Sequence, residues 1–190
     1  MPVLGIVASS ISGHLVPPFT QQGDYYAIAT TTLSGTASSI SFAGIPSNFT
    51  HLQIRYIAKT NYGSALDGSK VRFNDDSGSN YSWHQLYGGG GGAAASQGGA
   101  TQTYIYNGYT AGATNADLFG PGIIDILDYT NINKTKTVKT LLGVDFNGGG
   151  IVVAGSGNWY SLNAINSLTF TPWDGTSFLA NTSFALYGVK

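Results

Sequence analysis

The stretch THLQIRYIAKT, residues 50–60, alternates apolar and polar side chains with a period of two. Leu52, Ile54, Tyr56 and Ala58 share one side of this extended segment, and Gln53, Arg55 and Lys59 lie on the other. Because successive side chains of a strand point to opposite faces, the alternation predicts a half-buried β-strand. The fold class then depends on whether the same period recurs along the chain.

It recurs in VKTLLGVDF (138–146), SLTF (167–170) and SFLANTSFAL (177–186). The runs are separated by turn-forming segments: LSGTAS (33–38), NDDSGSN (74–80), NGGG (147–150) and WDGTS (173–177). No window has a convincing helical period, and the runs amount to about nine or ten strands. This pattern predicts an all-β fold, an antiparallel β-sandwich that is jelly-roll-like.

The last two runs are joined by Asp174-Gly175, a pair that favours a tight hairpin turn. In SFLANTSFAL the apolar residues Phe178, Ala180, Phe184 and Leu186 share one parity, so we expect them to point inward. Tyr187 has the opposite parity and is expected on the other face.

The glycine-rich stretch YGGGGGAAASQGGA, residues 87–100, allows three interpretations. A phosphate-binding loop would need a following helix, but a short alternating run follows, and no Lys occurs between Lys70 and Lys134. A domain linker would separate two cores, whereas the strands on both sides look like one set. We therefore expect residues 88–102 to form a long loop at one end of the sandwich.

The composition limits the classes of function. The chain has 190 residues, only 9% of them charged, a net charge of −1 and no cysteine. No clustered basic patch indicates nucleic-acid binding, and no run reaches the roughly 18 apolar residues that span a membrane. Cysteine chemistry is excluded, and a nearly neutral surface favours self-association.

Residues 1–23 differ from the rest, because they are apolar without strand alternation and contain Pro17 and Pro18. They lack a basic region like that of a signal peptide. We expect an extended N-terminal anchoring arm, followed by the sandwich domain at residues 24–190. The arm could pack on its own domain or dock on a neighbouring subunit. Its candidate anchoring residues are Val3, Leu4, Ile6, Val7, Ile11, Leu15, Val16 and Phe19.

No catalytic constellation stands out. Asp125 and Asp128 have an odd separation, which places them on opposite faces of a strand. The chain has no Gly-x-Ser-x-Gly motif, and its three histidines are isolated in the sequence. We expect neither enzymatic activity nor a cofactor.

The segment NDDSGSN offers a calcium candidate made of Asn74, Asp76 and Asn80. Its spacing is similar to that of an oxygen-rich calcium loop, but the bidentate Glu of such loops is missing. A hairpin turn explains the same residue types, so the expected metal content is none.

The chain is rich in aromatic residues, with twelve Tyr and three Trp. Most should fill the core, but rings near loops could stack on a sugar. The candidates for glycan stacking are Trp83, Tyr87, Tyr106, Trp159 and Tyr160.

Four stretches together carry a resemblance to a known group: THLQIR (50–55), NYSWH (80–84), SGNWYS (156–161) and FALYGVK (184–190). With the residues between them, they resemble small structural proteins of the virions of tailed bacteriophages, cyanophage-like ones included. The resemblance covers residues 25–190. It implies a jelly-roll-like sandwich and carries over no catalytic residue.

The resemblance and the composition together predict a non-enzymatic virion structural protein. It would lie on the particle surface, as a capsid decoration (cement) protein or a short fibre, and contact other virion proteins. Self-association is expected, as a trimer by analogy with projecting virion parts. The alternative is a carbohydrate-binding module of the tail that recognises a host surface glycan. A hydrolase of host glycans is disfavoured because no carboxylate pair is present.

Overall fold

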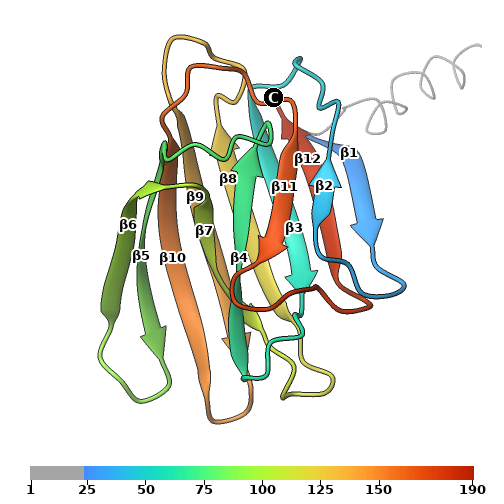
Figure 1. Ribbon diagram of the computed structural model, residues 1–190, viewed down its shortest axis with the longest axis vertical. Helices are drawn as coiled ribbons and strands as arrows, with labels where there is room; N and C mark the ends of the chain where they lie inside the picture. The colour runs from blue at the N-terminus through green and yellow to red at the C-terminus, as the bar shows by residue number, and fades with distance from the viewer. Residues whose placement is uncertain (1–23) are drawn as a thin grey trace, which may run out of the picture.

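The computed structural model describes residues 24–190, which form a sandwich of two antiparallel β-sheets (Figure 1). The strands are β1 (Tyr25–Thr32), β2 (Ile40–Phe42), β3 (His51–Ala58), β4 (Leu66–Phe73), β5 (Tyr81–Gly89), β6 (Ala95–Gln102), β7 (Ile105–Ala111), β8 (Gly120–Leu127), β9 (Lys136–Asp145), β10 (Gly150–Trp159), β11 (Leu168–Pro172) and β12 (Ser183–Val189). The predicted sandwich is confirmed. The anchoring arm, residues 1–23, lies outside the described residues.

The larger sheet has eight strands in the order β1-β12-β3-β8-β9-β10-β5-β6, and the smaller has four in the order β2-β11-β4-β7. In Figure 1 the small sheet covers the middle of the large one, and the β5–β6 hairpin extends beyond it at one side. Within residues 24–190 there is no helix whose length and apolarity would let it cross a membrane.

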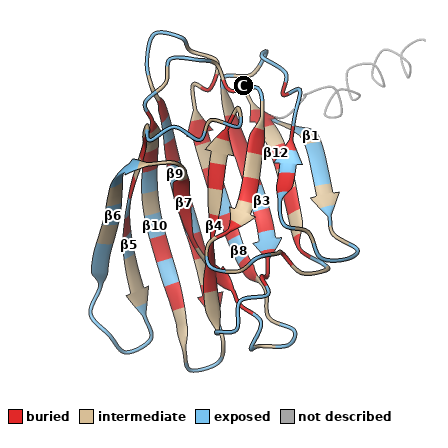
Figure 2. Ribbon diagram, in the orientation of Figure 1, coloured by how far each residue is buried: buried red, intermediate tan, exposed pale blue. Residues whose placement is uncertain are grey.

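The core lies between the two sheets, and the apolar sides of the alternating runs point into it (Figure 2). Leu52, Ile54 and Tyr56 of β3 are buried as predicted. Phe170 of the small sheet meets Phe184 of the large one, with ring centroids 4.8 Å apart. The period of two therefore identified the inward faces of these strands.

The prediction of a loop at residues 88–102 is wrong. β5 continues to Gly89, and Ala95–Gln102 return beside it as β6, the edge strand of the large sheet. Gly91, with φ of 87°, lies in the turn between them. An edge strand needs only backbone hydrogen bonds to one neighbour, so a run of Gly, Ala and Ser can form it without an apolar pattern.

The predicted hairpin at Asp174-Gly175 is also wrong, because β11 lies in the small sheet and β12 in the large one. The connection at residues 173–182 crosses between the sheets. Its Phe178 is fully buried and bridges to Ala37 and Thr60, whereas Ala180 is only half-buried. Phe184 and Leu186 do point inward, as expected.

Candidate functional site

A pocket of about 160 Å³ opens where the edge of the small sheet faces the β5–β6 hairpin. We call it the aromatic pocket, because the rings of Trp83, Tyr106, Tyr109 and Trp173 form much of its wall. β5 supplies Trp83, β7 supplies both tyrosines, and the crossing segment after β11 supplies Trp173. The four rings thus come from three separate parts of the sequence.

The aromatic rings of the pocket pack against one another, with Tyr106 at their centre. The centroid of the Tyr106 ring lies 4.1 Å from that of Trp173 and 5.1 Å from that of Trp83. Tyr106 occupies space that a side chain on β4 would fill, since a Cβ on Gly68 would lie 2.3 Å from its ring. Because Gly68 has no side chain, the Tyr106 ring can lie against the β4 backbone at this position.

Lys70 fixes the position of Trp173 in the wall of the aromatic pocket. Its Nζ donates a hydrogen bond to the backbone carbonyl of Trp173 at 3.0 Å and lies 5.8 Å from the Trp173 ring centroid. Burial lowers the pKa of the Lys70 ammonium, with the nearby Arg72 adding to the effect. Trp173 is therefore fixed by a cation–π contact and a hydrogen bond together.

Polar groups complete the aromatic pocket. The buried Asp67 carboxylate accepts hydrogen bonds from the backbone N–H groups of Asp174 (3.0 Å) and Gly175 (3.1 Å). Gln97 donates to the Tyr109 hydroxyl at 3.4 Å. The indole N–H of Trp83 is buried and has no hydrogen-bond partner among the described residues. An unpaired buried donor of this kind is costly for the fold.

The five predicted sugar-stacking residues separate into two groups. Trp83 and Tyr106 meet in the aromatic pocket, and Tyr87 lies beside it, with its ring 6.1 Å from that of Tyr109. Trp159 is 1% exposed and stacks on Tyr81 in the core, so no ring face is left for a sugar. Tyr160 is 60% exposed and lies outside the pocket.

The sequence interpretation missed Trp173 and Asp67. Trp173 opens the segment that we assigned to a hairpin turn, and Asp67 precedes Gly68 in a run with little alternation. Only the packing of the small sheet on the large one brings these two residues to Trp83.

The calcium candidate is a hydrogen-bonded turn in the structure. One oxygen of Asp76 accepts from the backbone of Gly78, and the other accepts from Asn80 and from the indole of Trp159 at 2.7 Å. The Asn74 side-chain oxygen accepts from the backbone of Asn166 and Ser167. These oxygens are already used within the chain, and residues 24–190 contain no group of three or more His or Asp side chains that could hold a metal ion.

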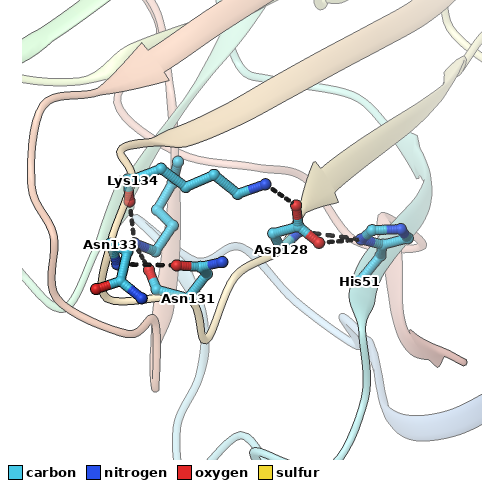
Figure 3. Close-up of polar contacts among 6 residues, drawn as sticks. His51, Asp128, Asn131, Asn133 and Lys134 are labelled. Atoms are coloured by element: carbon cyan, nitrogen blue, oxygen red, sulfur yellow. Dashed lines mark hydrogen bonds and ion pairs between the residues drawn. The ribbon is translucent and has the colours of Figure 1, made fainter.

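A second polar cluster lies at the end of β8, where Asp128 stands between His51 and Lys134 (Figure 3). The Asp128 backbone N–H donates to His51 Nδ1 at 3.0 Å, and Lys134 Nζ donates to the Asp128 carboxylate. The hydrogen bond from Lys134 holds the pKa of the Asp128 carboxyl below its usual value. Asp125 bonds instead to Gln53, so the two carboxylates do not converge. The Asp128–Lys134 ion pair is open to solvent and links the two ends of the β8–β9 loop.

The outer face of the large sheet carries an apolar band. The band consists of Ile57 (52% exposed), Leu86 (56%), Ile123 (38%), Leu141 (57%) and Val152 (63%). Leu86, Ala154, Leu141 and Ile123 lie in one row across β5, β10, β9 and β8. The exposed side of an antiparallel sheet is ordinarily polar, so an apolar row on this face departs from the usual pattern.

No protein-family model matches this sequence, and no curated protein has a significant match to it. Among solved structures, the chain is similar to the galectin LEC-6 of Caenorhabditis elegans. The TM-score is 0.32 and the identity 6%, over 88% of this chain and 96% of that one. Nothing about a ligand follows from a likeness of this size. The resemblance to phage virion proteins stays a prediction.

Proposed function

We propose that this protein is a carbohydrate-binding module whose binding site is the aromatic pocket. The observation that carries the proposal is the meeting of aromatic rings with hydrogen-bonding groups in one partly enclosed site. A sugar has apolar C–H faces and a rim of hydroxyls. Flat aromatic rings suit its faces, and carboxylate, amide and indole groups suit its rim.

The aromatic pocket offers both kinds of group, rings for the apolar faces of a sugar and polar groups for its hydroxyls. The Asp67 carboxylate, held by two backbone N–H groups, keeps lone pairs to accept from sugar hydroxyls. Burial raises the pKa of the Tyr106 hydroxyl, so that group stays protonated. The volume of about 160 Å³ lies below that of ordinary small-molecule pockets and favours a single sugar ring at a chain end.

A glycan array probed with the full chain tests the proposal. We expect wild type to bind a defined set of glycans, and Trp173→Ala to weaken that binding about tenfold or more, since losing one stacked ring costs about 1.4 kcal/mol or more. Asp174→Ala, at an exposed lining position, should weaken binding without unfolding the domain. Tyr160→Ala, outside the pocket, serves as the control and should bind as wild type does. Absence of binding by folded wild type, or equal binding by all variants, contradicts the proposal.

A second candidate is the predicted structural part of a phage virion, a capsid decoration protein or short fibre. The exposed apolar band on the large sheet favours it, because an assembling part needs a surface that neighbours cover. Antibody raised against the chain should then label intact particles of the phage that encodes it. Label found only on free protein would contradict this assignment.

A further inference from the structure

We propose that two copies of this chain pair face to face through the outer surfaces of their large sheets. The pair is related by a two-fold axis that lies in the interface and crosses the strands at the level of Leu142. This inference is independent of the sugar site, which opens at the sandwich edge. It rests on the shape, the apolarity and the charges of the outer face.

The outer face has large and small residues on successive rows. One row carries Leu86 on β5 and Leu141 on β9, with Ala154 between them on β10. The next outward-facing row reverses the sizes, with Gly88 and Gly143 on either side of Val152. Along each of these three strands, one large and one small outward-facing residue therefore lie next to each other.

A two-fold axis at the level of Leu142 places the row of Leu86, Ala154 and Leu141 in one copy opposite the row of Gly88, Val152 and Gly143 in the other. Leu86 then faces Gly88 of the second copy, and Leu141 faces its Gly143. On β10, Val152 faces Ala154 of the second copy. On β5, β9 and β10 each large side chain therefore meets a position with a small side chain or none, which is the interdigitation that packed sheets require.

Two hollows in the outer face match this arrangement. One, of about 420 Å³, is lined by Gly88, Gly143 and Val152 among others, where the leucines of a second copy would enter. The other, of about 390 Å³, is lined by Leu86, Ala154 and Ser156 among others, where Val152 of a second copy would enter. Both hollows lie on the strands that the axis crosses.

The charges flanking the rows are complementary under the same axis. Lys139 lies two residues before Leu141 on β9, Asp145 lies two residues after Gly143, and both are exposed. The axis places Lys139 of each copy opposite Asp145 of the other, giving two symmetric pairs at the rim. Such pairs fix register more than they add affinity.

The sheet is large enough for a stable contact. Eight strands of seven to ten residues present a face of roughly 1,000 Å², against about 800 Å² per partner in a standard interface. Aligned sheets cross at about 30° because of their twist, so the central strands β8, β9, β10 and β5 would carry most of the contact.

Sedimentation velocity of the full chain at micromolar concentration tests the pairing. We expect a dimer for wild type and a monomer for Leu141→Asp, which places a charge in the apolar centre. Gly88→Leu should also give a monomer, because the added side chain meets no atom of its own chain within 4 Å and fills the space for Leu86 of the second copy. Gly35→Leu is the matched control, since it too has open space and lies in the β1–β2 loop.

A charge exchange tests the register. Lys139→Asp alone and Asp145→Lys alone should each weaken dimerisation at least tenfold, and the double variant should restore it. Thermal melting of each variant shows that the domain remains folded. A monomeric or trimeric wild type overturns the proposal. An oligomer that persists in both Leu141→Asp and Gly88→Leu, or a double variant weaker than both single variants, also overturns it.

Discussion

Asp76 shows how one turn residue can stabilise the core. Its side chain closes the β4–β5 turn through Gly78 and Asn80, and it also accepts the indole N–H of the buried Trp159. Burial alone would raise the pKa of the Asp76 carboxyl. The hydrogen bonds donated by Asn80, Gly78 and Trp159 outweigh burial and hold that pKa below its usual value. The residue that we considered as a calcium ligand is therefore a structural acceptor.

Asp76→Ala should lower the free energy of unfolding by about 1–3 kcal/mol at pH 7, because the Trp159 indole loses its charged acceptor. The depressed pKa means that the stabilisation by Asp76 is present at neutral pH and is lost as the pH falls below about 4. Urea denaturation at pH 7 and at pH 2.5 measures both effects, so the gap between wild type and variant should shrink in acid. Exposed Asp117→Asn is the control. A gap that is unchanged in acid would show that the charge of Asp76 has no role.

The two faces of β12 differ in what they contact. Phe184 and Leu186 are fully buried, and the Phe184 ring stacks on Tyr56 with centroids 4.9 Å apart. Tyr187 is half-buried on the outer face, where the Arg55 guanidinium lies 5.3 Å from its ring centroid. The inner face of β12 is therefore buried, and its outer face is only partly covered.

Phe184→Ala should destabilise the domain by about 3–5 kcal/mol, because it leaves a cavity between the sheets. Tyr187→Ala should cost about 1 kcal/mol or less, the value of an exposed cation–π contact. Chemical denaturation in the Leu141→Asp background separates this difference from any effect of dimerisation. Equal costs for the two substitutions would contradict the one-sided strand.

Across the whole molecule, buried tyrosine hydroxyls make stability depend on alkaline pH. Burial raises the pKa of Tyr56, Tyr106 and Tyr129, and it raises the pKa of Tyr81 to about 12. The folded chain therefore keeps protons that the unfolded chain releases near pH 10. Burial also lowers the pKa of Lys70 and Lys136, which acts in the opposite direction, but these lysines are fewer.

The free energy of unfolding should fall as the pH rises above about 10, because ionised tyrosine favours the unfolded state. The tyrosinate absorbance of the native protein should therefore titrate in two steps. The later step, from buried rings such as Tyr56 and Tyr106, would appear only together with loss of the near-ultraviolet circular dichroism. A single step near pH 10, with the fold intact, would contradict this prediction.

The sequence by itself determined the β-class of the fold and the inward sides of β3, β9 and β12, because the side-chain direction along a strand is a local property with a period of two. It could not reveal β6, whose Gly, Ala and Ser residues carry no apolar pattern. Asp174-Gly175 looked like a hairpin because local turn chemistry does not specify which sheet the next strand joins. Only the tertiary structure decided that crossing, since it depends on packing Phe178 and Phe184 against distant strands. The packing of the small sheet on the large one also brings Trp173 to Trp83, about 90 residues away in the sequence, and so creates the aromatic pocket.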